Sequence, residues 1–168
     1  MTTNGIIFNG FSKYFCMTGW RLGWLILPED LLRPVERLAQ NLFISSHALS
    51  QWAAIAAFES REVLDRQIEV YARNRSYLLE HLPRAGLTDL APADGAFYLF
   101  ANVGSLTSDS QKLCRQLLQE TGVAITPGID FDPQGGSTYV RISFAAAEAE
   151  VAKACDRIVA WLAKQDIS

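Results

Sequence analysis

The chain has 168 residues, of which 49% are apolar and 20% charged, and its formal net charge is −3. Because disordered chains combine few apolar residues with a large net charge, this composition predicts a folded protein. The negative charge argues against nucleic acid as a partner, since a protein that reads the phosphate backbone needs a concentrated basic surface.

Membrane, export and metal-site patterns are also missing from the sequence. No apolar run approaches the roughly 20 residues that span a bilayer, and no export leader is evident. The three cysteines, Cys16, Cys114 and Cys155, form no CxxC pair, and only His47 and His81 are available to assist them. We therefore expect a cytoplasmic protein with reduced thiols, no metal site and no membrane partner. The charged share lies below the roughly 25% of a typical soluble domain, so we expect part of the surface to bind a partner.

Two strands and a helix are predicted in the first part of the chain. Residues 6–8 form a short apolar run close to glycines, which favours a strand buried on both faces. A stretch rich in Gly, Ser and aromatic residues follows, and its second half predicts another strand at residues 20–27. Pro28 then opens a helix, whose apolar residues recur at helical spacing until about Asn41.

The remaining elements alternate between helix and strand. An apolar stripe runs from QWAAIAAFE to Pro83 and predicts a long, bent helix that connects two lobes. Beyond it we expect strands at residues 96–100, 123–126 and 139–144, and helices at residues 108–122 and from about residue 146 onwards. This alternation indicates an α/β fold, with a domain boundary inside the long helix at about residues 60–71.

Lys13 is the first candidate for chemistry, because it lies in an apolar loop directly after a predicted buried strand. An amine that loses the water around its charged form becomes available as a nucleophile toward a carbonyl group. A solvated surface lysine would have no such role. Its position alone does not separate these two interpretations.

Two arginines are candidates for binding an anion. Arg21 lies between Trp20 and Leu22, and a guanidinium between large apolar side chains requires an anionic partner, either a ligand or a protein carboxylate. Arg141 alternates with the apolar residues of its predicted strand, so it points either to solvent or into a cleft that holds an anion. The glycines near Arg21 match neither common nucleotide-binding pattern.

These residues together match a known family. The stretch NGFSKYFCMTGWRLGW, which contains Lys13 and Arg21, resembles the cofactor-lysine segment of the class I/II aminotransferases. Those enzymes belong to the fold-type-I superfamily, which depends on pyridoxal phosphate. The segments QWAAIAAF, DGAFYLF, GVAITPGIDF and YVRISFA follow in the order found in that family. The resemblance therefore covers essentially the whole chain.

The resemblance implies roles for four residues. Lys13 would be the catalytic lysine, which forms the Schiff base with pyridoxal 5′-phosphate and carries the proton. Ser12 and Arg21 would bind the phosphate of that cofactor, and Arg141 would hold the substrate α-carboxylate. The implied reaction transfers an amino group between an α-amino acid and a 2-oxo acid, in an enzyme that is a homodimer at full length. A lyase of the same superfamily, which uses this lysine for β-elimination, is the alternative activity.

The resemblance also implies that the chain is the C-terminal part of such an enzyme. Before the lysine, family members supply a phosphate loop, an aromatic residue on the cofactor ring, an Asn, and an Asp at the pyridine nitrogen. Too few residues precede Lys13 for these to be present. We therefore expect residues 1–65 to be the end of the large cofactor domain with the start of the interdomain helix, and residues 66–168 to be the small α/β domain.

Two consequences are expected for the chain by itself. It should have little or no transaminase activity, because the group that stabilises the cofactor ring is missing. It should also associate or dissolve poorly, because apolar segments that the cofactor domain and a second subunit would cover are left uncovered. The alternative to an enzyme fragment is a truncated α/β module with a structural or binding role and no catalytic function.

Overall fold

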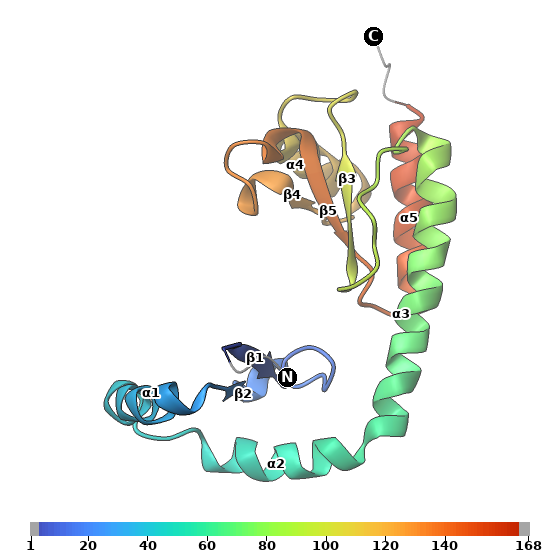
Figure 1. Ribbon diagram of the computed structural model, residues 1–168. Coiled ribbons are helices and arrows are strands. Elements are labelled where there is room, and N and C mark those ends of the chain that lie inside the picture. The colour runs from blue at the N-terminus through green and yellow to red at the C-terminus, as the bar shows by residue number, and fades with distance from the viewer. Residues whose placement is uncertain (1–3, 165–168) are drawn as a thin grey trace. The chain divides into compact units, whose positions relative to one another are not determined.

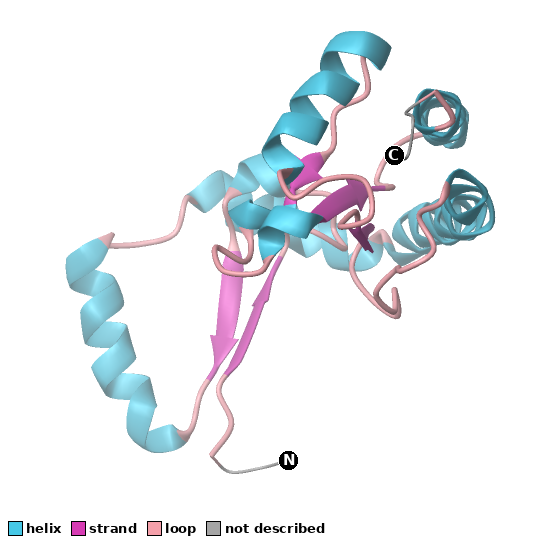
Figure 2. Cartoon of the chain, turned by 90° about the horizontal axis from the view of Figure 1, so that it is seen from above, coloured by secondary structure: helices cyan, strands magenta, loops and turns pink. Residues whose placement is uncertain are grey.

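The structure is a computed structural model and describes residues 4–164. The chain forms two compact units, Met1–Arg66 and Gln67–Ser168. Helix α3 (Arg61–His81) begins in the first unit and ends in the second (Figure 1). The chain combines helices and strands (Figure 2), which agrees with the α/β fold class predicted from the sequence.

The first unit contains an antiparallel strand pair. β1 (Ile7–Gly10) pairs with β2 (Gly23–Ile26), and Gly10 lies opposite Gly23. A Cβ atom on Gly23 would lie 2.7 Å from the Asn9 carbonyl oxygen, so only glycine allows the two backbones to approach so closely. β2 is shorter than the strand predicted at residues 20–27, because Thr18–Trp20 forms a 3-10 helix, η1, and Arg21 adopts a left-handed conformation.

Two helices follow β2 in this unit, α1 (Glu29–Leu42) and α2 (Ala48–Glu59). Pro28 is the N-cap residue of α1, and Glu29 and Asp30 place negative charge in its first turn, where it is favourable. The expected long helix is in fact two helices, α2 and α3, because the backbone leaves the helical conformation at Ser60. The carbonyl oxygen of Ser60 accepts the backbone N–H of Leu64 at 3.2 Å and so begins α3.

Much of the apolar surface in the first unit is exposed. The prediction that residues 6–8 are buried on both faces was wrong for the described chain: Phe8 is 76% exposed, since β1 has β2 as its sole strand partner. Trp52 on α2 is 73% exposed. The buried cluster is small and contains Phe11, Met17 and Ala54. Further exposed apolar residues are Ile6, Ile7, Leu25, Ile26, Leu32, Leu38, Leu42, Leu49, Ile55 and Phe58.

This exposed apolar surface leads us to expect self-association of the intact chain. Contiguous apolar patches of more than a few hundred Å² are rare on soluble monomers and mark binding surfaces. Sedimentation velocity should therefore show species larger than a monomer, and Trp52→Lys combined with Ile55→Lys should shift the distribution toward monomer. Leu118→Lys, at an exposed position of the second unit, is the control and should have no effect. A dilute, stable monomer of the unmodified chain would contradict this expectation.

The second unit contains a three-stranded antiparallel sheet of order β3–β5–β4. β3 spans Tyr98–Asn102, β4 spans Thr126–Pro127 and β5 spans Tyr139–Ser143. β3 begins later than predicted, because Ala96 has a φ of 61°, outside the strand region. β4 is shorter than predicted, and it ends at Pro127, which has no N–H to donate to the ladder. The short 3-10 segments of this unit are Leu82–Ala85, Gly128–Asp130 and Gly136–Thr138.

Two helices and the end of α3 complete this unit. α4 (Ser110–Thr121) is capped by Asp109, whose carboxylate accepts the backbone N–H of Lys112 at 3.0 Å, and it ends at Gly122, which has a φ of 72°. α5 spans Glu148–Leu162. None of the helices in residues 4–164 has the length and apolarity needed to cross a bilayer.

The core of the second unit confirms the alternation predicted for residues 139–144. Val140, Ile142 and Phe144 are buried, and they pack in one apolar cluster with residues of α3, β3, α4 and α5. The buried side chain of Asn74 donates hydrogen bonds to the carbonyl oxygens of Phe144 and Ala146, at 3.0 and 2.9 Å. This core fixes which face of β5 is free to carry polar side chains.

The three cysteines should differ in reactivity. Burial raises the pKa of Cys114 and of Cys155 from 9.0 to about 11, because the interior disfavours the thiolate. Cys16 is exposed. At pH 8 a thiol reagent should therefore modify Cys16 in the folded protein and reach the other two after unfolding. Peptide mapping of the modified cysteines checks this, and early labelling of Cys155 would contradict it.

Candidate active site

Lys13 lies in the loop that connects β1 to β2. The backbone N–H of Phe11 donates to the Leu22 carbonyl at 3.1 Å, and that of Met17 donates to the Phe11 carbonyl at 3.0 Å, so the loop folds back on itself. Phe11 and Met17 are buried, whereas Lys13 is exposed. The loop therefore buries apolar side chains on both sides of Lys13 in the sequence, whereas Lys13 itself is exposed to solvent.

The same loop carries Ser12, which is half-buried, and Tyr14. The Tyr14 hydroxyl donates to the Asp65 carboxylate at 2.8 Å and so links the loop to α3. This hydrogen bond to a carboxylate raises the pKa of Tyr14 above its usual value of 10.0, because the hydroxyl proton is held in place. A tyrosine therefore fixes the loop next to Lys13 without contributing a charge of its own.

Arg21 follows η1 in a conformation that is unusual for a residue with a side chain. Its φ and ψ are 50° and 48°, which is the left-handed region. Its Nη1 donates to the Thr18 carbonyl at 2.8 Å. The sequence left open whether a protein carboxylate pairs with Arg21, and in residues 4–164 the structure records no ion pair for it.

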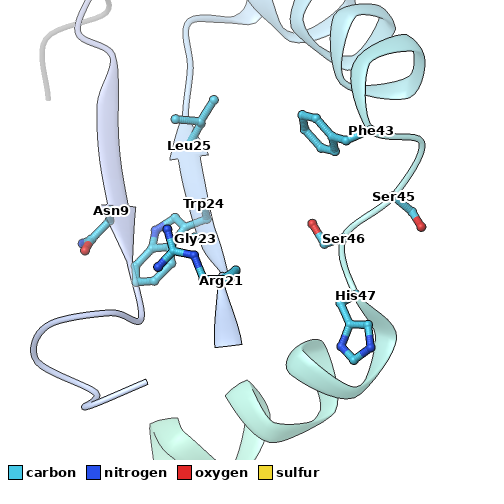
Figure 3. Close-up of a pocket in the computed structure, with 9 residues that line it drawn as sticks. All are labelled: Asn9, Arg21, Gly23, Trp24, Leu25, Phe43, Ser45, Ser46 and His47. Atoms are coloured by element: carbon cyan, nitrogen blue, oxygen red, sulfur yellow. The ribbon is translucent and has the colours of Figure 1, made fainter. Parts of the chain in front are cut away.

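Arg21 lines a pocket of about 520 Å³ in the first unit. Figure 3 shows the pocket between β2 and the segment Phe43–His47. Its other lining residues are Asn9, Gly23, Trp24, Leu25, Phe43, Ser45, Ser46 and His47, so Ser12 and Lys13 are not part of this lining. The lining thus combines an arginine with two serines, an asparagine and a histidine, which are residue types that can bind an anion.

Arg141 lies on β5, opposite Phe100 of β3 and Thr126 of β4. Its guanidinium carbon is 4.5 Å from the ring centroid of Phe131 and 5.2 Å from that of Tyr98, and its Nη2 donates to the Thr126 hydroxyl at 3.3 Å. The Nε atom is buried without a hydrogen-bond partner, and no carboxylate of the described residues pairs with the guanidinium. Arg141 is thus held by aromatic rings and keeps its charge available for an anion.

Sequence reasoning identified Arg141 and missed the two rings that hold it. Phe100 of β3 pairs with Arg141, and Tyr98 lies two residues earlier on the same face of β3. A correct prediction of this strand pairing would therefore have placed Tyr98 near Arg141. Phe131 lies outside the strands, just after the 3-10 segment Gly128–Asp130, and no periodic signal marks it. It takes its place over the guanidinium through the fold of the loop between β4 and β5.

The predicted site residues fall into two groups. Ser12, Lys13 and Arg21 share the loop between β1 and β2 in the first unit, whereas Arg141 belongs to the second unit. Within residues 4–164, no group of three or more His, Cys, Asp or Glu side chains is placed to bind a metal ion.

Comparisons with known proteins agree with the motifs. The family model described as Aminotransferase class I and II matches residues 1–158. The chain is 50% identical over 164 residues to the valine–pyruvate aminotransferase of Mycobacterium tuberculosis, and the match covers 96% of this chain and 42% of that protein. It is 37% identical over 161 residues to the (5-formylfuran-3-yl)methyl phosphate transaminase of Methanocaldococcus jannaschii, covering 95% of this chain and 42% of that one.

The fold agrees as well. A crystal structure of an aminotransferase from Mycobacterium tuberculosis superposes with a TM-score of 0.95 at 49% identity, and the match covers 98% of this chain and 43% of that one. The chain therefore spans less than half the length of these relatives. Its motifs, its α/β fold and the match over residues 1–158 show that the chain belongs to the aminotransferase class I and II family.

Proposed function

We propose that this chain forms part of an aminotransferase that uses pyridoxal 5′-phosphate to transfer an amino group between an α-amino acid and a 2-oxo acid. One observation carries the proposal: in a chain of this family, an amine and a guanidinium, Lys13 and Arg21, stand on the single loop between β1 and β2. When bound, the cofactor supplies the electron sink for bond changes at the substrate Cα.

The residues present fit two parts of this cofactor. Lys13 is an exposed residue that an aldehyde can approach, and Arg21 lines a pocket whose other residues include donors that suit a phosphate group. Ser12 adds a hydroxyl to the same loop. We propose that the contacts to the cofactor ring come from the part of the family fold that has no counterpart in these residues. On this basis, the chain by itself should have little or no activity.

In the proposed reaction, Lys13 would hold the cofactor through its Nζ, and the same nitrogen would move the proton at the substrate Cα. The long side chain of an exposed lysine suits both tasks, because the same nitrogen must reach two atoms in turn. Arg21 and Ser12 would hold the phosphate end of the cofactor and so keep the reacting atoms aligned with Lys13.

Arg141 is proposed to hold the substrate α-carboxylate. Its support is the guanidinium between Phe131 and Tyr98, which has no carboxylate partner in the described chain. The two rings restrict the rotation of the guanidinium, so its planar fork is oriented before the substrate arrives. A carboxylate would be bound through two charge-assisted hydrogen bonds.

Valine and pyruvate are the first donor and acceptor to test, since they appear in the name of the relative with 50% identity. The relatives reported above are named as aminotransferases or transaminases, which favours amino-group transfer over β-elimination. We also propose that the complete enzyme is a homodimer, in line with the apolar surface that the first unit leaves uncovered.

Borohydride reduction tests the assignment of the cofactor. The complete enzyme is mixed with pyridoxal phosphate and reduced, and the modified peptide is then found by mass spectrometry. The expected adduct is on Lys13, because borohydride would reduce an imine at its Nζ to a secondary amine, which no longer hydrolyses. An adduct on another lysine would refute the proposed site.

A further inference from the structure

We infer that Ser50, oriented by His47, is a positioning residue for Arg21. The inference deepens the proposed function and rests on it, because it concerns the guanidinium that we propose binds the cofactor phosphate. All three residues belong to the first unit. Arg21 and His47 line the same pocket (Figure 3), and Ser50 lies in the first turn of α2, three residues after His47.

The first step is the contact between Ser50 and the turn that contains Arg21. The Ser50 side chain is 2% exposed, and its hydroxyl donates to the carbonyl oxygen of Trp20 at 2.8 Å. Trp20 is the last residue of η1 and the direct neighbour of Arg21. The Trp20 carbonyl belongs to the peptide group that joins Trp20 to Arg21. This hydrogen bond therefore restrains the ψ angle of Trp20, directly before the left-handed Arg21.

The second step concerns His47, whose Nδ1 lies 3.2 Å from the Ser50 hydroxyl oxygen. A serine hydroxyl has one proton, and the Trp20 carbonyl accepts it. The Ser50 oxygen must therefore accept a hydrogen bond from Nδ1–H of His47. The hydrogen bonds therefore run in one direction, from Nδ1–H of His47 to the Ser50 hydroxyl and from that hydroxyl to the Trp20 carbonyl. Nε2 is the second polar atom of His47, whose side chain also lines the pocket.

The third step is the conformation of Arg21 itself. A residue with a side chain at a φ of 50° is strained, and it keeps that conformation only when its surroundings hold it. Two contacts of the turn do so. One is the bond from Arg21 Nη1 to the Thr18 carbonyl at 2.8 Å, and the other is the bond from Ser50 to Trp20. Without the Ser50 bond, the turn can relax and move the guanidinium away from the pocket.

Binding of an anion to the intact protein tests this inference. The measurements are the Kd of inorganic phosphate and of pyridoxal 5′-phosphate by titration calorimetry, with the thermal unfolding midpoint of each variant recorded without ligand. Ser50→Ala should raise both Kd values about fivefold to tenfold, since the loss of one restraining hydrogen bond is of that order. Ser50→Thr keeps the hydroxyl and should restore binding. Ser50→Cys, a weak donor of similar size, gives the same comparison if Ser50→Ala does not fold.

A matched control separates positioning from general stability. Ser110 is 1% exposed, and its hydroxyl donates to the Gly136 carbonyl at 3.1 Å, in the second unit. Ser110→Ala removes the same kind of bond and should lower the unfolding midpoint while both Kd values stay within about twofold. If Ser50 had a merely structural role, Ser50→Ala would behave in the same way.

Arg21→Ala distinguishes failure of this inference from failure of the proposed function. If Arg21→Ala weakens binding of both ligands and Ser50→Ala does so more mildly, with Ser110→Ala unchanged, the inference is supported. If Arg21→Ala weakens binding and Ser50→Ala does not, the inference is refuted and the role of Arg21 stands. If Arg21→Ala leaves both Kd values unchanged, the proposed phosphate site is itself refuted.

Discussion

Replacing Lys13 with alanine is expected to lower kcat for amino-group transfer by at least about 10³-fold in the complete enzyme. The substitution removes the amine that we propose attaches to the cofactor and moves the proton at the substrate Cα. No other lysine lies on the loop between β1 and β2 to replace it. Steady-state rates with valine and pyruvate measure the loss. The borohydride adduct should disappear in the same variant, because its site of attachment is gone.

The control for this variant is Lys112→Ala. Lys112 is an exposed lysine of α4 in the second unit, and its removal changes the charge of the chain by the same amount. It should leave the rate and the adduct unchanged. A Lys13→Ala enzyme that kept a rate within about tenfold of the original would rule out Lys13 as the proton carrier, because general acid–base groups contribute about 10²–10⁴-fold.

Arg141→Ala is expected to raise KM for the amino-acid donor about 100-fold, with cofactor affinity unchanged. Loss of one partner of a hydrogen-bonded charge pair costs about 2–5 kcal/mol, and about 1.4 kcal/mol corresponds to a tenfold change. Arg141→Lys keeps the charge but loses the planar fork and the stacking on Phe131 and Tyr98, so it should restore binding in part. The KM values and the Kd of pyridoxal phosphate are measured on the same preparations.

Arg84→Ala provides the matched control. Arg84 is also in the second unit, but its side chain is exposed and pairs with Glu80, which is four residues away in the chain. Such surface pairs contribute about 0–1 kcal/mol, so its removal should leave KM unchanged. If Arg141→Ala has the same KM as the unmodified enzyme, Arg141 does not bind the substrate carboxylate.

Much of the fold followed from local patterns. The alternation of residues 139–144 predicted the buried set Val140, Ile142 and Phe144, because a strand places successive side chains on opposite faces. The helix that ends at Gly122 was predicted for a similar reason, since glycine readily adopts the positive φ that ends a helix. These predictions succeeded because each depends on a few neighbouring residues.

The failed predictions depend on backbone conformations that residue type does not reveal. Arg21 and Ala96 have positive φ values although neither is glycine, and they shorten the predicted strands at residues 20–27 and 96–100. The surrounding structure holds such residues in place, so a local pattern cannot indicate them. The break at Ser60 was missed for a related reason, because the apolar stripe continues across it.

The sequence by itself determined the fold class, the family resemblance and the identity of Ser12, Lys13, Arg21 and Arg141 as candidates. Residue types at characteristic spacings are enough for that, since the spacing reflects the chemistry that the family shares. Only the tertiary structure decided what holds the two arginines: the Ser50 hydroxyl on the Trp20 carbonyl for one, and the rings of Phe131 and Tyr98 for the other. These contacts join residues far apart in the chain, and they form because packing brings them within hydrogen-bonding or stacking distance.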